Sequence, residues 1–584
     1  MDVFVVPSDG SAAPTALTHT PEETMLVSWA PDSRGVIVAE DHDGDERVRL
    51  FLVDLERPLE MCPLTEDHPA YFIRGGELHP DRRRLFYGAN YDAERQVEIE
   101  PTWIYRHDLQ SGERRAIARP ERAASGGPQL NRQGTHLLYA RQDRHPAGRQ
   151  WYVVDVEGRE DREILNFGDA VKVTAEWFPD GERILVLSES RDGRAQQHRS
   201  LGVYRWANGE MSWLIDDPAR NIEHASVSPD GVVVVDEVRE AGHRPSWVDA
   251  ETGTETPFPR IAGSFVPLGR APDGTWIGLN YSATVPTELV RREADARSAG
   301  DLRSLTRVWE HTDLDRARLA PAEDFRWQSD DGLTIQGWLY RAHPNPRRAI
   351  IYIHGGPTAH AEDRLRPEQQ YYVARGFNVL DVNYRGSTGF GLAFQEAIKA
   401  DGWGGHEQAD IAAGAKALIR AGLAEPRRVG VTGTSYGGYS SWFLITHYPP
   451  AIIAAAAPIC GMTDLVVDYN TTRPDLRPYS EEMLGGTPAQ VPERYHERSP
   501  INFVQDIRGR LLIIQGAQDP NVTPENVRQV VKALDAHGIP YELLVFPDEG
   551  HGISKPANQA ELYRRLVAFF EDALGPDVDE RSGK

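Results

Sequence analysis

The second half of the chain alternates short apolar runs with longer segments whose apolar residues recur at helical spacing. Buried parallel strands joined by amphipathic helices give this pattern. The apolar runs of strand length are residues 349–353, 378–382, 429–432, 511–514 and 543–546. The helical segments include residues 367–375, 408–421 and 439–445. We therefore expect an α/β domain with a mostly parallel, doubly wound sheet that carries helices on both faces.

The first half repeats one unit about every fifty residues. Each unit places a Pro-Asp turn between two short apolar runs, and a second hairpin follows. The turns begin at Pro31, Pro80, Pro179, Pro229 and Pro272, with a decayed copy at residues 130–134. A four-stranded propeller blade has this length. The repeat predicts an all-β propeller, because a β-sandwich array would explain the strands but not the single period.

The number of blades depends on the first residues of the chain. Six units lie between about residues 25 and 300, and residues 2–18 resemble the outer half of one more. The first and last strands of a propeller usually share a blade. The pattern alone therefore leaves six or seven blades open.

A charged, irregular stretch separates the two halves. It covers about residues 301–325, and a hairpin with an Asp-Gly turn follows at residues 325–340. We therefore predict a β-propeller domain over residues 1–320 and an α/β domain over residues 321–584.

Composition limits the partners and the compartment. A chain of 584 residues is too long for one core, and its net charge of -24 disfavours nucleic acid and anionic membrane surfaces. Cys62 and Cys460 are the only cysteines, which excludes a disulfide framework and a thiolate zinc site. No leader and no apolar run of transmembrane length stands out. We expect a cytoplasmic protein with no membrane partner.

One acidic stretch resembles a calcium-binding loop. Residues 41–45 read Asp-His-Asp-Gly-Asp. The glycine is misplaced for such a loop, and no glutamate follows at the required distance. A hairpin tip is the better interpretation, and the sequence predicts no metal or other cofactor.

The chemistry centres on Ser435. Residues 433–437 read Gly-Thr-Ser-Tyr-Gly, between an apolar strand and an apolar helix. This is the nucleophile-elbow pattern, in which the flanking glycines allow a sharp turn that exposes the serine hydroxyl. A matching acid and base follow in the order that α/β-hydrolases use, Asp519 and then His551, each after an apolar strand. Loops at the carboxyl ends of parallel strands share one edge, so the three side chains can meet there.

An earlier loop supplies the expected oxyanion site. His354-Gly355-Gly356-Pro357 follows the strand at residues 349–353. In such folds the N–H of this loop acts with the N–H of the residue after the nucleophile. We expect Gly356 and Tyr436 to be the donors, and His354 to brace the glycines.

These motifs resemble a known family. His-Gly-Gly-Pro, Asn-Tyr-Arg-Gly-Ser-Thr-Gly-Phe-Gly at residues 383–391, Gly-Thr-Ser-Tyr-Gly-Gly-Tyr at residues 433–439 and Gly-His-Gly at residues 550–552 follow a propeller. In this order they are similar to the prolyl oligopeptidase family of serine peptidases, and within it to the acylaminoacyl-peptidase branch. The resemblance implies a seven-bladed propeller that screens access to a triad of nucleophile Ser435, base His551 and orienting acid Asp519.

The resemblance also suggests where substrate is recognised. Many relatives have an arginine two residues after the catalytic aspartate, whereas this chain has Asn521, as in the dipeptidyl-peptidase branch. A hydrophobic pocket for the residue before the cleaved bond is implied at Met462, Leu465, Tyr469 and Val522, although ordinary core packing fits these residues equally well. Arg473 and Arg477 could hold a substrate carboxylate, but a solvated role is the better interpretation.

The sequence therefore predicts a serine peptidase that acts on short peptides, as an acylaminoacyl-peptidase-like exopeptidase or an oligopeptidase. Dipeptidyl-peptidase or carboxypeptidase specificity and carboxylesterase activity stay open as alternatives. A propeller fused to an inert hydrolase domain is a further alternative, which the intact triad disfavours. Asp548 and Glu549 are rival acids for His551. The oligomeric state, including a homo-oligomer, is also left open.

Overall fold

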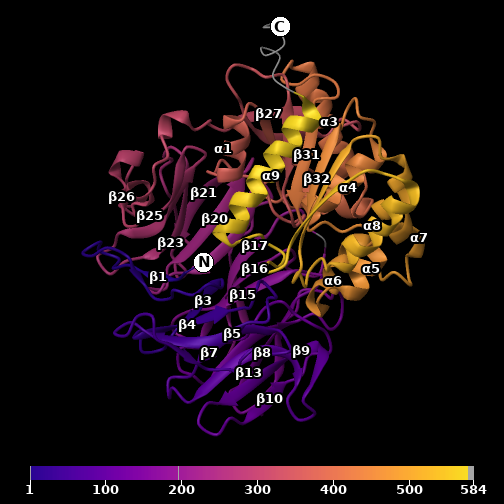
Figure 1. Cartoon of the computed structure of the whole chain (residues 1–584). Helices are drawn as coiled ribbons and strands as arrows, with labels where there is room; N and C mark the ends of the chain where they lie inside the picture. The colour runs from indigo at the N-terminus through magenta and orange to yellow at the C-terminus, as the bar shows by residue number, and fades with distance from the viewer. Residues whose placement is uncertain (1, 195, 576–584) are drawn as a thin grey trace.

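The computed structural model describes residues 2–194 and 196–575. In Figure 1 the indigo to magenta first half forms a propeller below and to the left of the orange to yellow α/β domain. Over the described residues, no helix combines the length and the apolar character needed to cross a bilayer. The cytoplasmic location stays a prediction.

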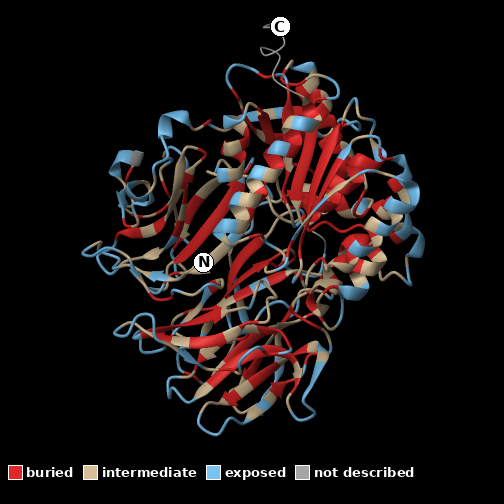
Figure 2. Ribbon diagram, viewed as in Figure 1, coloured by how far each residue is buried: buried red, intermediate tan, exposed pale blue. Residues whose placement is uncertain are grey.

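Within the described residues, six four-stranded antiparallel sheets form the blades in chain order. Their strands are β3–β6 (Thr24–Trp29, Gly35–Glu40, Arg49–Asp54, Met61–Pro63), β7–β10 (Ile73–Leu78, Arg84–Asp92, Val97–Asp108, Arg114–Ala118), β11–β14 (Gln129–Leu130, His136–Arg141, Gln150–Asp155, Arg162–Leu165), β15–β18 (Val173–Trp177, Arg183–Ser188, Ser200–Arg205, Glu210–Ile215), β19–β22 (Ile222–Val227, Val233–Arg239, Gly242–Val248, Glu255–Pro257) and β23–β26 (Ser264–Arg270, Trp276–Ser282, Val285–Arg292, Arg303–Ser304). Their apolar side chains pack between consecutive blades, which gives the buried strand centres seen in Figure 2.

The prediction of seven blades is wrong. Among the described strands, β1 (Phe4–Val5) and β2 (Thr15–Ala16) pair only with each other. The N–H of Leu59 donates to the carbonyl of Leu17 at 3.1 Å, and Arg303 donates to the carbonyl of Gly10 at 3.2 Å. This short pair therefore lies between the first and last blades and joins them, but two residues per strand do not build a blade.

The α/β domain contains one eight-stranded sheet in the order β27-β28-β30-β29-β31-β32-β33-β34. β27 pairs antiparallel with β28, β28 pairs antiparallel with β30, and the six strands β29 to β34 are parallel to one another. The strands are β27 (Glu323–Gln328), β28 (Thr334–Tyr340), β29 (Ala349–Ile353), β30 (Asn378–Asn383), β31 (Val429–Thr434), β32 (Ala455–Ile459), β33 (Arg510–Gly516) and β34 (Glu542–Phe546). The predicted domain boundary at residue 320 falls between β26 and β27.

Helices cover both faces of this sheet. α3, α4 and α8 pack with Ile351, Val431 and Ile513 in one apolar cluster, and α1 and α9 pack with Ile350 and Leu512 in another. The helices are α1 (Pro367–Ala374), α2 (Leu392–Glu396), α3 (His406–Arg420), α4 (Tyr436–His447), α5 (Leu465–Thr471), α6 (Arg477–Leu484), α7 (Pro492–Glu497), α8 (Glu525–His537) and α9 (Pro556–Leu574). Alternate strand residues thus face opposite helix layers, as the fully apolar strands predict.

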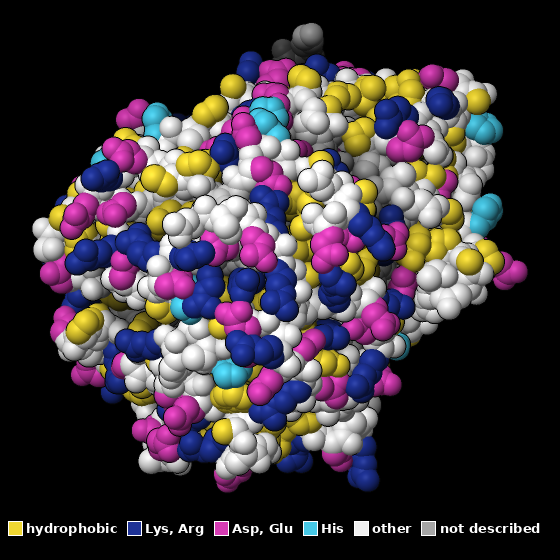
Figure 3. Space-filling model, turned by 90° about the horizontal axis from the view of Figure 1, so that it is seen from below, with side chains coloured by type: hydrophobic (Ala, Val, Ile, Leu, Met, Phe, Trp, Pro, Cys, Tyr) yellow, Lys and Arg dark blue, Asp and Glu magenta, His cyan; other side chains and the backbone are white. Residues whose placement is uncertain are grey.

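Acidic and basic side chains are interspersed on the face that Figure 3 shows. Ion pairs also join the two domains, as between Lys172 of the propeller and Glu482 of α6 at 2.5 Å. Acidic side chains are therefore partly paired with basic ones, and the net charge of -24 is the acidic excess that remains.

Candidate active site

The turn at Ser435 has the geometry that the glycine-flanked motif predicts. β31 ends at Thr434, α4 begins at Tyr436, and Ser435 between them has φ 62° and ψ -120°. A Cβ added at Gly433 or Gly437 would lie 2.2 Å or 2.0 Å from the carbonyl oxygen of Ile353. Only glycine allows β29 to approach this closely, and the turn holds Ser435 at the sheet edge.

The carboxylate of Asp519 lies beside the ring of His551. Asp519 Oδ2 is 2.8 Å from His551 Nδ1. Asp519 Oδ1 accepts the backbone N–H groups of Asn521 at 2.8 Å and Val522 at 3.0 Å. Because both oxygens are engaged and the residue is 2% exposed, the carboxylate is held in one orientation toward the histidine.

The two rival acids have other partners. Asp548 pairs with Lys555 at 3.1 Å and accepts the side-chain amide of Asn558. Glu549 is buried and accepts the backbone N–H groups of Ser554 and Lys555, each at 3.0 Å. Among the described residues, Asp519 is the carboxylate hydrogen-bonded to His551.

The three predicted triad residues lie in loops that follow β31, β33 and β34, which are close neighbours in the sheet. Within the described part of the chain, no hydrogen bond joins the Ser435 hydroxyl to His551. Apo hydrolases often have such loose contacts, which tighten when substrate binds. The structure therefore pairs the acid with the base directly and brings the serine to the same edge.

The loop after β29 borders the nucleophile. A Cβ added at Gly355 would lie 3.4 Å from Cβ of Ser435. His354 stacks on Tyr384 with ring centroids 4.4 Å apart, and its Nε2 lies 2.9 Å from the hydroxyl of Ser387. This ring packing braces the loop beside Gly356. Tyr436 is the first residue of α4, so its N–H has no acceptor within the helix and is available to an oxyanion.

A propeller loop completes the surroundings of His551. Residues 41–48 connect β4 to β5, and a Cβ added at Gly44 would lie 2.4 Å from the backbone nitrogen of Gly550. In the same loop Glu46 Oε1 accepts the side-chain amide of Asn521 at 2.6 Å, and Oε2 forms an ion pair with Arg473. The sequence did not lead us to predict Glu46 as a site residue, although the acid-rich turn at residues 41–45 stands directly before it.

The electrostatics favour a charged imidazole. Burial alone would lower the pKa of His551, but the charge and hydrogen bond of Asp519, with a further contribution from Glu46, raise it above its ordinary value. An imidazolium is the form that His551 must adopt after taking a proton from the serine.

The residues predicted to line the substrate pocket are divided between core and rim. Met462, Leu465 and Val522 are buried in the apolar cluster under α4, while the half-buried Tyr469 donates to Glu481 at 2.7 Å. Arg473 and Arg477 are paired rather than solvated, with Glu46 and Glu100 of the propeller respectively.

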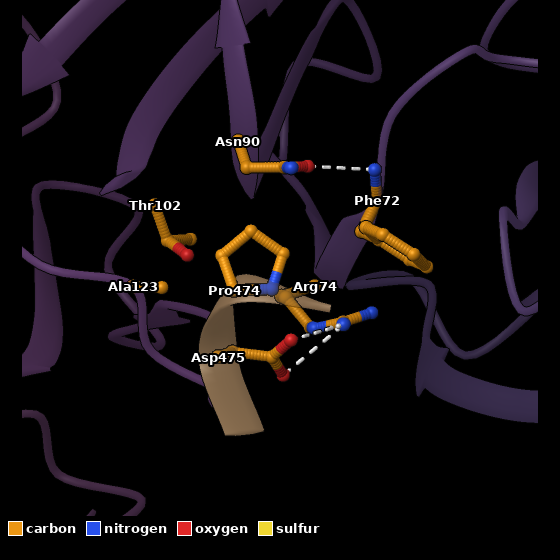
Figure 4. Close-up of a pocket in the computed structure, with 7 residues that line it drawn as sticks. All are labelled: Phe72, Arg74, Asn90, Thr102, Ala123, Pro474 and Asp475. Atoms are coloured by element: carbon orange, nitrogen blue, oxygen red, sulfur yellow. Dashed lines mark hydrogen bonds and ion pairs between the residues drawn. The ribbon is translucent and has the colours of Figure 1, made fainter. Parts of the chain in front are cut away.

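Where the domains meet, the described residues line a smaller and a larger hollow. The smaller, shown in Figure 4, is filled by Pro474 and closed by Arg74, whose guanidinium lies 3.1 Å from both oxygens of Asp475. The larger is a cavity of about 440 Å³. Its lining includes Arg47 and Glu100 of the propeller and Pro520 and Thr523 of the loop after Asp519, so it opens beside the catalytic loops.

Two groups of side chains among the described residues could be considered for a metal. Cys460 lies with Asp519 and His551, their ligand atoms within 4.8 Å of one another. Burial, with the charge of Asp519, raises the pKa of the Cys460 thiol, so it stays protonated and this group fits the triad rather than an ion. The second group, His243 with His360 and Glu362, lies between the domains.

Known proteins resemble the α/β domain in sequence, and some resemble nearly the whole chain. Residues 364–577 match the model of the prolyl oligopeptidase family. Dipeptidyl aminopeptidase BIII of Pseudoxanthomonas mexicana is 25% identical over 98% of this chain and 84% of its own length. Acylamino-acid-releasing enzyme 1 of Oryza sativa subsp. japonica is 29% identical over 38% of this chain and 30% of its own.

The whole architecture also recurs in solved structures. A puromycin-hydrolyzing peptidase of Mycobacterium tuberculosis superposes with a TM-score of 0.81 over 99% of this chain and 91% of its own, at 22% identity. At this identity the likeness shows the fold, a propeller joined to an α/β-hydrolase domain.

Proposed function

We propose that the protein is a serine-type peptidase that removes residues from the free amino ends of short peptides, because residues 364–577 match the model of the prolyl oligopeptidase family. The observation that carries this proposal is the carboxylate of Glu46, which the propeller places against Asn521, two residues from the predicted catalytic acid. The match to a dipeptidyl aminopeptidase over nearly the whole chain supports the same specificity.

Each predicted triad residue has a defined part in the reaction. His551 takes the proton of Ser435 as the hydroxyl attacks the peptide carbonyl, and Asp519 holds the ring with Nδ1 toward itself. The N–H groups of Gly356 and Tyr436 stabilise the oxyanion, where loss of one donor costs about 3 to 4 kcal/mol. His551 then returns the proton to the leaving amine, and water hydrolyses the acyl-enzyme.

A free amino terminus matches the polar groups beside the triad. Glu46 contributes a negative charge, and each of its oxygens keeps lone pairs beyond the contacts with Asn521 and Arg473. Among the described residues, Asn521 Oδ1 is buried without a hydrogen-bond partner. An ammonium group offers three donors and a positive charge to these acceptors, whereas an acylated nitrogen offers one donor and no charge.

The interdomain cavity is consistent with a limit on substrate size. Its walls come from both domains, and its volume is about 440 Å³. The loop after Asp519 forms part of its wall, whereas neither Ser435 nor His551 lines it. This position beside the triad, with the match to a dipeptidyl aminopeptidase, supports short peptides as the substrate class.

The proposal is tested with dipeptidyl anilides that carry a free or an acetylated amino terminus. We expect kcat/KM to favour the free amine, and Glu46→Gln to lower it about 10- to 100-fold because one charged hydrogen bond is lost. Glu113→Gln, at an exposed glutamate of the propeller, is the matched control.

Three results would overturn this assignment. Preference for the acetylated anilide would instead indicate acylaminoacyl-peptidase specificity, which the match to acylamino-acid-releasing enzyme 1 makes the second candidate. Equal loss on both substrates would show that Glu46 does not recognise the amine. Hydrolysis of short-chain esters with no cleavage of either anilide would indicate an esterase.

A further inference from the structure

Two histidines and one glutamate meet where the propeller contacts the α/β domain. His243 belongs to β21, while His360 and Glu362 lie in the loop after β29. One nitrogen or oxygen of each lies within 4.8 Å of the others. Glu362 stands between the rings, with Oε2 3.7 Å from His243 Nε2 and Oε1 3.7 Å from His360 Nε2.

Both rings are oriented by a contact on the opposite nitrogen. His243 Nδ1 lies 2.9 Å and 3.0 Å from the two oxygens of Asp236. His360 Nδ1 lies 2.7 Å from the hydroxyl of Thr388. The Nε2 atoms thereby face Glu362, and the hydroxyl of Tyr281 lies among these groups, 3.1 Å from His243 Nε2 and donating to Glu362 Oε2 at 2.5 Å. Metal-binding histidines are held in this way, by an acceptor on the nitrogen that does not bind the ion.

His360 Nε2 lacks the partner that its burial requires. The side chain of His360 is 12% exposed, and among the described residues its Nε2 has no hydrogen-bond partner. Burying a polar atom without a hydrogen-bond partner costs free energy. An ion bound to His360 Nε2 would remove this cost.

We propose that His243, His360 and Glu362 bind one divalent transition-metal ion of the zinc class, which links the propeller to the α/β domain. Two imidazoles and one carboxylate form a known zinc ligand set, with a fourth position open to a water molecule. Mg²⁺ and Ca²⁺ prefer oxygen ligands and fit this set poorly. The charges of Asp236 and Glu362 together balance a divalent cation.

The ion would fix the loop that leads away from the predicted oxyanion donor. The carbonyl of Ala359 accepts the N–H of Thr388 at 3.0 Å, and the side chain of Asp363 accepts the N–H of Ala283 of the propeller at 2.7 Å. His360 and Glu362 lie between these two anchors and four to six residues after Gly356. A metal at this point holds the two domains together beside the active site without taking part in the chemistry.

Titration of the full chain with metal alone tests the proposal. After dialysis against a chelator, Zn²⁺ should bind at one equivalent per chain in calorimetry and raise the midpoint of thermal unfolding. Co²⁺ should give the visible absorption bands of a nitrogen- and oxygen-ligated site.

Variants locate the site. His360→Gln and Glu362→Gln should each weaken Zn²⁺ binding at least about 100-fold, and Asp236→Asn about 10- to 100-fold, because an orienting partner is lost. His537→Gln, at an exposed histidine of α8, is the matched control and should bind as the wild type does. An anomalous-diffraction peak beside Glu362 in zinc-soaked wild-type crystals would support the site independently of how the variants fold.

The proposal is overturned if the wild type binds no stoichiometric Zn²⁺ or Co²⁺, or if binding survives the three substitutions. An anomalous peak elsewhere would also overturn it. In those cases the hydroxyl of Tyr281, which contacts both His243 Nε2 and Glu362 Oε2, links these side chains instead of a metal ion. None of these readouts depends on peptidase activity, so they leave the proposed function untouched.

Discussion

At the residue scale, the carboxylate of Asp519 controls the orientation of the His551 ring. One oxygen is bound by two backbone N–H groups and the other by the imidazole. Asp519→Asn keeps the shape but places an amide N–H or a neutral oxygen against Nδ1, which favours the wrong tautomer. We expect kcat to fall about 10⁴-fold.

Asp548→Asn is the control for this substitution, because Asp548 contacts Lys555 rather than the imidazole. Both variants are compared in steady-state hydrolysis of the preferred anilide. Near-normal turnover by Asp519→Asn would move the acid to Asp548 or Glu549.

The pH profile should report the charge of Glu46. The histidine must be neutral to accept the serine proton, so kcat/KM rises with pH as His551 loses its proton. Asp519 and Glu46 raise the pKa of His551, so this rise in kcat/KM should occur above pH 6.5, the ordinary pKa of histidine. Glu46→Gln removes a negative charge that stabilises the imidazolium, so kcat/KM of this variant should rise at a lower pH.

This shift is measured from kcat/KM of wild type and Glu46→Gln at low ionic strength, where charge interactions are least screened. If kcat/KM of Glu46→Gln rises at the same pH as that of the wild type, or at a higher pH, Glu46 does not act on His551 through its charge.

At the element scale, the sequence predicted the strands and helices of the α/β domain well. Fully apolar runs such as β29 and β33 can be buried on both faces, and the glycine-flanked serine marks a strand-to-helix turn. The count of seven blades, which the family resemblance implied, was wrong because residues 2–18 have strand-like composition but form strands of two residues. Amino-acid composition does not show how many residues of a strand pair with a neighbouring strand.

The elbow glycines are tested by Gly437→Ala. The new Cβ would lie 2.0 Å from the carbonyl oxygen of Ile353, so β29 and α4 must move apart. We expect turnover to be lost and the free energy of unfolding to fall by about 1 to 3 kcal/mol. Gly126→Ala is the control, because no atom lies within 4 Å of its added Cβ. Urea unfolding and anilide turnover measure the two effects, and an active, stable Gly437→Ala would contradict this packing.

At the scale of the whole molecule, contacts between the domains were beyond sequence reasoning. Arg473, just before α6, and Arg477, its first residue, were predicted to be solvated, yet each pairs with a propeller glutamate. Such ion pairs form only when the two folded domains dock. Their members lie some 400 residues apart in the sequence, so no local sequence pattern indicates them. The same reason hid the contact of Glu46 with Asn521 and the cluster around Glu362, although the acid-rich turn before Glu46 was visible in the sequence.

The buried pair of Arg74 and Asp475 should hold the domains together. Its side chains are 13% and 4% exposed, and Asp475 also pairs with Arg473 at 3.3 Å, so removing the carboxylate charge leaves the guanidinium of Arg74 buried without its ion pair. Asp475→Asn should therefore cost about 3 to 5 kcal/mol of stability. Asp67→Asn breaks the exposed pair with Arg49 and should cost less than about 1 kcal/mol. Thermal unfolding compares the two, and equal effects would contradict an interface held by this pair.

The central claim is that Ser435 is the nucleophile of an assembled triad. The most direct measurement is fluorophosphonate labelling of the folded protein, followed by mass spectrometry of the modified peptide. The account predicts one label, on Ser435, with a labelling rate that rises with pH as His551 loses its proton and falls sharply in Asp519→Asn. Folded protein that stays unlabelled, or that carries the label on another residue, would contradict it.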